Sequence, residues 1–341
     1  MSQEGSITMQ GSRRYGVGRL GCSGRLDHPH HLASVGLACL VSANRAGRPV
    51  AAALVLAAAL LAAGGCANLG AVREFAGGAA ALTDYRAATN DYLASADRQL
   101  EELPADARFD ATRAHLQALK AATAGQKATL LKLHAATTGY MQALAQLAGA
   151  DAYSVAPAIG KVGGAIRASG ELGIDASHVK AYENIAQRVS DWALAAKQAR
   201  DARRFVAANG ADIDKLLEAM QLATKAYGIV LDQEQQAREA VADYRRAQWS
   251  ATSGLPAGSE LTPERRATIV MLLRRAELQD QAAQQQARKA QRAAAAGLAR
   301  VRQAHAAMLA DVDHLGRPEV RALLQQASDD LESIRQSLAD L

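Results

Sequence analysis

The sequence predicts an all-α protein, an elongated antiparallel bundle of long, coiled-coil-like helices within residues 66–341. Alanine, leucine, glutamine, arginine and glutamate dominate this region, and all of them favour helices. Apolar residues recur at alternating steps of three and four, which keeps one stripe of a helix turned toward one partner. Sequence patterns typical of strands are almost absent.

Two helices are expected in the first part of this region. The first covers about residues 69–103, is weakened at Gly77-Gly78, and ends before Pro104 because proline lacks the N–H that a helix interior needs. The second covers about residues 105–148 and carries the clearest stripe, about 60 Å long at about 1.5 Å per residue. The stripe consists of Phe109, Thr112, Leu116, Leu119, Thr123, Gln126, Leu130, Leu133, Thr137, Tyr140, Leu144 and Leu147.

A second stripe begins at His178 and ends at Val206. Asn209-Gly210 follows, and we expect this pair to end the helix because glycine readily adopts the left-handed conformation found just past helix ends. A separate helix with a third stripe is expected from there to about Ser250. Its members are Leu216, Met220, Ala223, Tyr227, Val230, Glu234, Ala237, Val241, Tyr244 and Gln248.

The longest helix is expected over residues 263–313. Thr262 supplies a capping hydroxyl, and the proline that follows suits the first helical position. The middle of its seam is nearly all alanine, and small residues bury little area, so we expect a weakly held section there. The seam consists of Ile269, Leu272, Ala276, Ala283, Ala287, Ala290, Ala294, Leu298, Val301 and Met308. A break at residues 314–318 then precedes a final helix over residues 319–340.

An apolar segment of 14 residues, "VAAALVLAAALLAA" at residues 50–63, precedes these helices. As a helix it would extend about 21 Å, less than the hydrocarbon thickness of about 30 Å. Arg45 and Arg48 precede it and small residues follow it. This pattern is typical of a secretory signal peptide rather than of a membrane span. An uncleaved N-terminal anchor is the alternative.

The segment ends in "AGGC" at residues 63–66, which resembles the lipobox of bacterial lipoproteins, with Ala63 where leucine is usual. The resemblance implies that residues 45–65 are a signal peptide and that cleavage occurs before Cys66. It implies that Cys66 then carries acyl chains such as palmitate, which anchor the protein in the lipid membrane. Ala67, which is not an aspartate, implies the outer membrane, with the protein facing the periplasm.

We expect residues 1–44 to be a non-native or disordered extension, since they hold no periodic apolar pattern. Without residues 1–65 the chain has 33 basic and 32 acidic residues, and Cys66 is its only cysteine. This balance does not indicate a nucleic-acid partner. The arginine pairs, such as Arg274-Arg275, alternate with acids and are expected on a solvated surface.

The segment "AYSVAPAIGKVGGAIRASGELGI" at residues 152–174 departs from the helical pattern. Gly160 and Gly164 have the spacing that permits close helix contact in lipid, so both are candidate membrane-contacting residues. The segment loosely resembles the apolar hairpin of helical pore-forming toxins, although three charged side chains interrupt it. A short helix and turn folded over one end of the bundle is the alternative.

No complete catalytic or metal-binding pattern is found in the sequence. Ser177 and Lys180 match the S-x-x-K spacing of serine acyl-transfer enzymes, but the companion elements S-D-N and K-T-G are missing, and Ser177 lies at an expected helix start. Asp311, Asp313 and His314 are conceivable metal ligands, but a solvated helix end explains them better. We therefore expect no enzymatic activity, no metal and no cofactor.

These observations favour a non-enzymatic envelope lipoprotein whose helical bundle is a scaffold or binds other envelope proteins. One alternative is a membrane-active protein that inserts residues 152–174. The other is an enzyme whose site is assembled from scattered polar residues. Release of dye from liposomes would distinguish the membrane-active protein, and turnover of an envelope substrate would indicate the enzyme.

Overall fold

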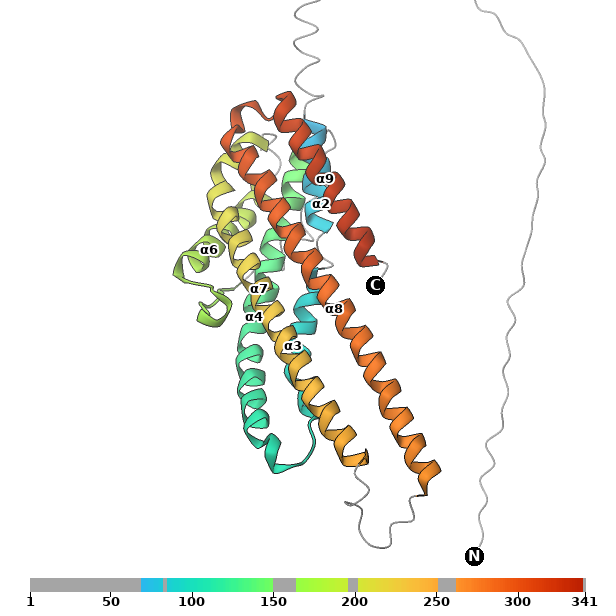
Figure 1. Ribbon diagram of the computed structural model, residues 1–341. Coiled ribbons are helices and arrows are strands. Elements are labelled where there is room, and N and C mark those ends of the chain that lie inside the picture. Colours follow the sequence, from blue (N-terminus) through green and yellow to red (C-terminus); the bar gives the residue numbers. More distant parts are fainter. Residues whose placement is uncertain (1–68, 82–84, 150–163, 196–201, 251–261, 340–341) are drawn as a thin grey trace, which may run out of the picture. The chain divides into compact units, whose positions relative to one another are not determined.

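The computed structural model describes residues 69–81, 85–149, 164–195, 202–250 and 262–339 (Figure 1). All of them belong to one compact unit, residues 53–341. The described residues are mostly helical and form no strand beyond a lone bridge between Ser169 and Ile174. The prediction of an all-α fold of packed helices is confirmed. The elongated, coiled-coil-like character stays a prediction.

The described elements are seven α-helices and three short 3₁₀ turns. In chain order they are α2 (Gly70–Ala80), α3 (Tyr85–Glu102), η3 (Ala107–Phe109), α4 (Asp110–Leu147), η4 (Gly170–Leu172), α6 (Ala176–Ala195), α7 (Ala202–Ser250), α8 (Pro263–Ala310), η5 (Val312–His314) and α9 (Pro318–Ala339). Among these residues, no helix combines the length and the apolar character that crossing a membrane requires.

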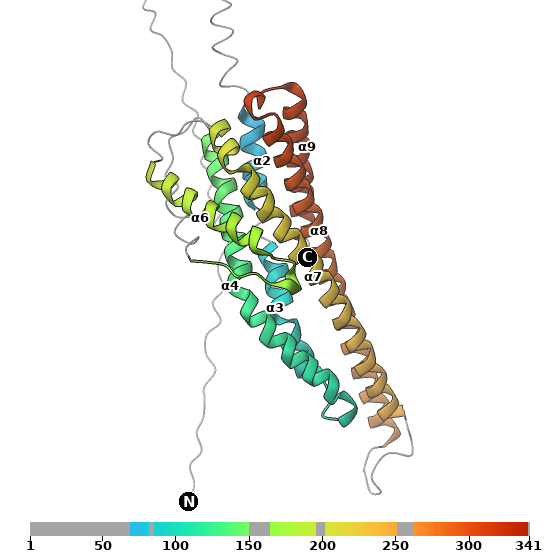
Figure 2. The ribbon, with the colours of Figure 1, turned by 90° about the vertical axis from the view of Figure 1, so that its left-hand side faces the viewer.

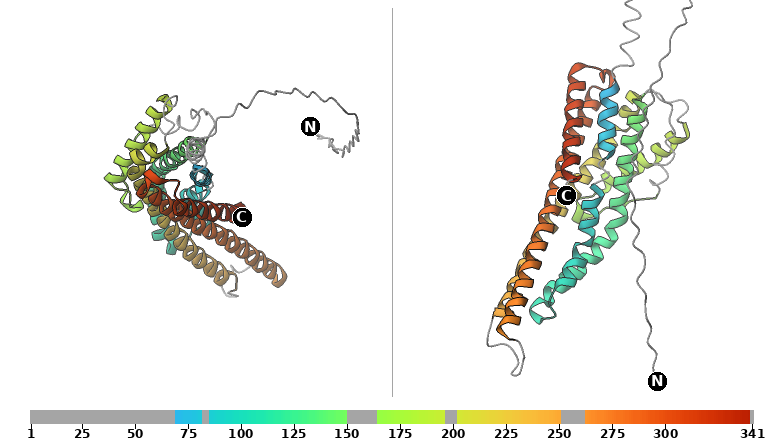
Figure 3. Two further views of the ribbon diagram at one scale, coloured as in Figure 1. Left: turned by 90° about the horizontal axis from the view of Figure 1, so that it is seen from above. Right: turned by 90° about the vertical axis from the view of Figure 1, so that its right-hand side faces the viewer.

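Helix α7 lies at the centre of the bundle and packs against α3, α4, α6 and α8 (Figure 1). Figure 2 shows α6 lying across α4 and α7. Helix α9 packs on α8 and α2, alongside the C-terminal half of α8 (Figure 3). Side chains from all of these helices form one apolar core. Its largest fully buried members include Phe75, Tyr140, Tyr182, Ile185, Ile213 and Tyr227.

The single helix expected over residues 69–103 is two helices, α2 and α3. The expected weak point, Gly77-Gly78, lies inside α2, so its position is wrong. Val72 and Phe75 of α2 are fully buried against the rest of the core. Tertiary packing therefore keeps the glycine pair helical despite its low helix propensity.

The stripe of α4 is confirmed, because none of its twelve members is exposed. In the first half of α4 burial is confined to that stripe, as at Leu116 and Thr123. In the second half burial spreads to neighbouring faces, and His134, Ala136 and Met141 are buried as well. Helices α2, α6 and α7 surround this second half, so it has several partners where the first half has few.

The prediction that Asn209-Gly210 ends a helix is wrong, because α7 continues through both residues. The side-chain Nδ2 of Asn209 donates to the carbonyl oxygen of Phe205, one helical turn back, at 2.8 Å. A Cβ on Gly210 would lie 2.6 Å from Cδ1 of Leu309 on α8. The glycine therefore permits the close approach of α7 and α8 rather than a helix end.

The expected start of α8 is confirmed. The side chain of Thr262 accepts a hydrogen bond from the backbone nitrogen of Arg265 at 3.3 Å, and Pro263 takes the first helical position. The expected seam is confirmed only in part. Ala294, Leu298, Val301 and Met308 are buried, whereas Leu272, Ala276 and Ala283 are exposed. The seam fails there because α9 accompanies only the C-terminal half of α8.

Candidate functional site

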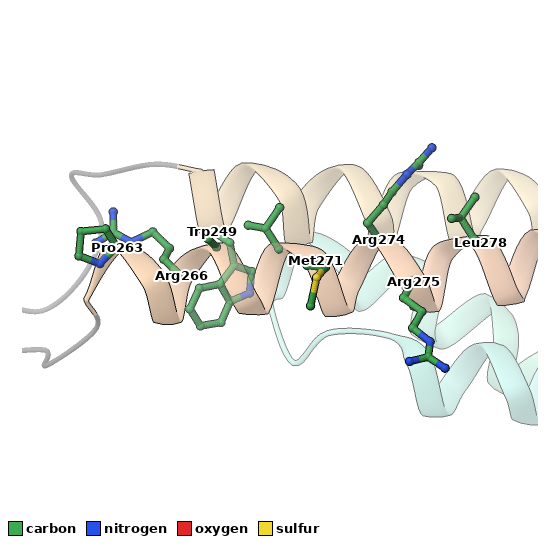
Figure 4. Close-up of a pocket in the computed structure, with 9 residues that line it drawn as sticks. Trp249, Pro263, Arg266, Met271, Arg274, Arg275 and Leu278 are labelled. Atoms are coloured by element: carbon green, nitrogen blue, oxygen red, sulfur yellow. The ribbon is translucent and has the colours of Figure 1, made fainter.

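The strongest candidate site is an open groove at the end of α8 that is remote from α9. We call it the α8 groove; it offers about 1080 Å³ of space. Trp249 of α7 contributes to it, and all other lining residues belong to α8 (Figure 4). They are Pro263, Arg266, Ala267, Val270, Met271, Arg274, Arg275 and Leu278.

Exposed apolar side chains gather at this groove. Five large apolar side chains are exposed in the described residues, and four of them lie between residues 270 and 278 of α8. Three of these four line the groove: Val270 is 42 % exposed, Met271 63 % and Leu278 52 %. Single exposed apolar residues are common, but a contiguous set indicates an interaction surface.

The groove also carries positive charge, because three arginines and no acid line it. Arg274 forms an ion pair with Glu277 at 3.0 Å, while the Nε of Arg266 has no hydrogen-bond partner. Among the described residues Arg275 has no acidic partner. In Figure 4, Arg274 and Arg275 extend to opposite sides of the row of apolar side chains. The site is therefore apolar along its length and cationic on both flanks.

A second candidate is the buried carboxylate of Glu234 on α7, which is 2 % exposed. One of its oxygens accepts from the hydroxyl of Ser95 at 2.5 Å and from Arg98 at 3.1 Å. The other accepts from the Nε of Arg98 at 3.2 Å and lies 3.1 Å from Arg238. Both oxygens are thus occupied by groups on α3 and α7. This cluster fixes the register of the two helices and presents no free group for chemistry.

Further buried hydrogen bonds join α3 to α4 and α7. Thr89 contacts the Nε2 of His134 at 2.8 Å and the hydroxyl of Tyr227 at 3.2 Å. Tyr92 donates to the side-chain oxygen of Gln126 at 2.7 Å. Burial, with a smaller contribution from the charge of Arg86, lowers the pKa of His134 to about 3. The imidazole is therefore neutral near pH 7 and unsuited to proton exchange there.

One more buried pair connects α4 to α8. The hydroxyl of Tyr140 lies 2.8 Å from the Nε2 of His305. Burial lowers the pKa of His305 to about 4 and raises the pKa of Tyr140 above its ordinary range. Both side chains are thus neutral near pH 7, and the pair contributes to packing between the helices.

The predicted lipidation residue, Cys66, and the predicted membrane-contacting Gly160 lie outside the described residues. Gly164 has a φ of 85°, and a Cβ there would lie 2.8 Å from the Nζ of Lys132 on α4. Downstream of Gly164, the apolar side chains of Ile166 and Leu172 are buried in the core. The described part of the segment 152–174 is therefore packed against the bundle.

The structure does not pair Ser177 with Lys180. At the start of α6 the carboxylate of Asp175 accepts hydrogen bonds from the backbone nitrogen and the hydroxyl of Ser177, at 2.8 and 2.7 Å. The pKa of Asp175 is lowered to about 2, mainly by the hydrogen bond from the Ser177 hydroxyl. Lys180 is exposed. The aspartate is thus the capping residue, and the serine hydroxyl is committed to it.

Asp311, Asp313 and His314 lie at the turn between α8 and α9. Asp311 contacts the Nδ1 of His314 and the guanidinium of Arg317, each at 3.2 Å. Within the part of the chain that the structure describes, no three histidine, cysteine or acidic side chains are grouped as metal ligands would be.

No family model, curated protein or solved structure matches this chain. The sequence reasoning missed the α8 groove, because it assigned Leu272 to a buried seam and Arg274-Arg275 to ordinary solvated surface. The available signal was a cluster of apolar residues, Val270, Met271 and Leu278, of which Met271 and Leu278 are seven residues apart and share one helix face.

Proposed function

We propose that this chain is a non-enzymatic lipoprotein of the bacterial envelope that binds another protein through the α8 groove. The observation that carries the binding role is the concentration of exposed large apolar side chains at residues 270–278. The lipobox-like sequence ending at Cys66 supports the anchor and the outer-membrane location facing the periplasm.

The packing of α2 supports a separation between anchor and groove. Glu74 of α2 accepts a hydrogen bond from Gln325 of α9 at 3.1 Å, and Gly78 lies beside Leu331. Helices α2 and α9 therefore run in the same direction, and Gly70 lies toward the α8–α9 turn. The proposed lipid carrier, Cys66, precedes Gly70 by four residues in the sequence. Met271 is about 60 Å from the turn, at about 1.5 Å for each residue of α8.

The interior favours binding over catalysis. The buried carboxylate of Glu234 is engaged with Ser95 and Arg98. His134 and His305 are neutral near pH 7 because burial lowers the pKa of each. A general acid or base works best with a pKa near the working pH. In the described part of the segment 152–174 the side chains of Ile166 and Leu172 are buried in the core, so we do not propose the membrane-active function.

The anchor is tested by Cys66→Ser in the native host. We expect cleavage to be blocked and labelled fatty acid to be absent, because the sulfur that would carry lipid is gone. The measurements are metabolic labelling with palmitate and the mass of the chain. If the variant is cut before residue 66 and stays with the membrane, the lipoprotein proposal is wrong.

The binding role is tested with a photo-crosslinking amino acid at position 271, in the groove. Position 292 is the control, because Arg292 is an exposed residue of the same helix outside the groove. We expect one or more proteins to be captured in intact cells from position 271 and not from position 292. The absence of any crosslinked protein at position 271 would contradict binding through the groove.

The enzymatic alternative is tested by Ser177→Ala combined with Lys180→Ala. Both residues are exposed, so the bundle should remain folded. We expect the crosslinks from position 271 and any phenotype of the host to be unchanged. Loss of the phenotype with intact crosslinks would indicate catalysis instead.

A further inference from the structure

We infer that the occupant of the α8 groove is an acidic amphipathic helix of another protein. This inference rests on the proposed binding function and adds the chemistry of the partner. It follows from the spacing of the apolar residues, the distribution of charge, and the place of the groove along α8.

The apolar row has the geometry that accepts a helix. Ala267, Met271 and Leu278 follow each other at steps of four and seven, so they lie along one face over about three turns, about 16 Å. Trp249 adds a large aromatic surface from the end of α7. A partner helix with apolar residues at the same spacing can lay its stripe along this row.

The positive charge of the groove favours a negatively charged partner. Arg266, Arg274 and Arg275 line the groove, and no carboxylate does. Glu277 is shared between Arg274 at 3.0 Å and Arg246 at 3.5 Å, so it leaves the other groove arginines without an acid. Carboxylates on both sides of a partner's apolar stripe would form paired hydrogen bonds with guanidinium groups. A basic partner would meet like charges.

The alternative occupants fit these observations less well. In a two-fold dimer of this chain the same patch faces itself, which would oppose arginines to arginines. An anionic membrane has the right sign, but Gly70, which follows the proposed anchor in sequence, lies toward the α8–α9 turn, and Met271 is about 60 Å from that turn. An acidic protein that binds at this end of the bundle avoids the repulsion between arginines and does not require the groove to reach the membrane.

The test uses the purified full chain in detergent and two fluorescent peptides of 21 residues. Both have leucine at heptad positions a and d; one has glutamate at the flanking positions e and g, and the other has lysine. We expect fluorescence anisotropy to show at least about tenfold tighter binding of the glutamate peptide. Arg275→Glu should weaken that binding at least about tenfold, and Arg292→Glu less than about twofold.

Two substitutions of neighbouring apolar residues test the groove without changing its charge. Met271 and Leu272 are neighbours on α8, and they are 63 % and 55 % exposed, but only Met271 lines the groove. Met271→Ala should weaken binding of the glutamate peptide at least about fivefold, and Leu272→Ala less than about twofold. Circular dichroism should confirm that all four variants keep the helix content of the parent.

Three outcomes would overturn the inference. Equal binding of the two peptides would remove the acidic character of the partner. Binding to vesicles with 30 % phosphatidylglycerol that is sensitive to Arg275→Glu, without peptide binding, would indicate a membrane surface. A dimer in analytical ultracentrifugation that Met271→Asp abolishes would indicate a second copy. If crosslinks from position 271 to a different protein persist in any of these cases, the binding function stands and only the partner chemistry is wrong.

Discussion

The two halves of α8 have apolar rows at helical spacing but end in different surroundings. In the C-terminal half Ala294, Leu298, Val301, Ala304 and Met308 are each at most 1 % exposed. In the N-terminal half four of the five large apolar side chains between residues 270 and 278 are 42–63 % exposed. The helix is continuous between them.

The difference lies in the partners. The C-terminal half packs against α7 and α9, and its His305 meets Tyr140 of α4. The N-terminal half lies beyond the end of α9, with α7 and α3 on one side. An apolar row therefore predicts that one face of a helix is suited to packing against a partner. Whether this chain itself provides that partner depends on the neighbouring helices.

The largest expected difference comes from truncating one leucine in each half. Leu298→Ala should lower the free energy of unfolding by about 3 kcal/mol, because it removes buried contacts and leaves a cavity. Leu272→Ala should change it by less than about 0.5 kcal/mol, because the side chain is exposed. Urea unfolding followed by circular dichroism measures both. Similar losses in the two variants would mean that the N-terminal half is also buried.

A smaller difference is expected in how stability depends on pH. Burial lowers the pKa of His305 from 6.5 to about 4. The unfolded chain therefore binds more protons between these values. The stability contributed by the neutral imidazole is present above about pH 6.5 and is lost as the pH falls, by up to about 1.4 kcal/mol per pH unit. His305→Gln should flatten the pH dependence of the unfolding free energy between pH 6 and 4.5 by that amount.

His115→Gln is the matched control for the histidine experiment. His115 is exposed on the first half of α4, where few helices surround it. We expect removal of this exposed side chain to change the free energy of unfolding by less than about 0.5 kcal/mol. If His305→Gln keeps the parental pH dependence, the imidazole of His305 is solvated or charged in the folded protein, and the C-terminal half of α8 is less tightly packed.

The smallest effect distinguishes two glycines. A Cβ on Gly125 in α4 would meet nothing within 4 Å, so Gly125→Ala should stabilise the fold by up to about 1 kcal/mol through helix propensity. A Cβ on Gly210 would lie 2.6 Å from Cδ1 of Leu309. Overpacking costs about 1–3 kcal/mol, so Gly210→Ala should destabilise by about 1 kcal/mol net. Unfolding midpoints that shift upward in both variants would contradict the close contact of α7 and α8.

Much of the fold could be predicted from local sequence. The stripe from Phe109 to Leu147 and the start of α8 at Thr262 depend on spacing and capping within a few turns, and both are confirmed. The prediction at Gly210 was wrong because a glycine that ends a helix and one that admits a neighbouring helix look alike in sequence. Only the position of Leu309 distinguishes them.

The candidate site was less predictable. Residues 263–283 contain apolar residues on more than one face, Leu272 and Met271 among them, and their spacing does not state that both of these side chains are left exposed. The length of α9 and its place beside α8 determine this. The buried bonds of Glu234 were equally inaccessible, because Ser95 precedes it by 139 residues.

Because the two halves of α8 are packed differently, hydrogen exchange along this one helix can report whether the α8 groove is occupied. Amide hydrogens near Leu298 should exchange with deuterium only when the bundle unfolds as a whole, whereas those between residues 265 and 280 should exchange by local opening. A partner that binds over Met271 should slow exchange between residues 265 and 280 and leave exchange near Leu298 unchanged. Exchange at residues 265–280 thus reports binding, and exchange near Leu298 serves as the reference within the same helix. Mass spectrometry of peptides from α8 can therefore follow binding without a label on the protein.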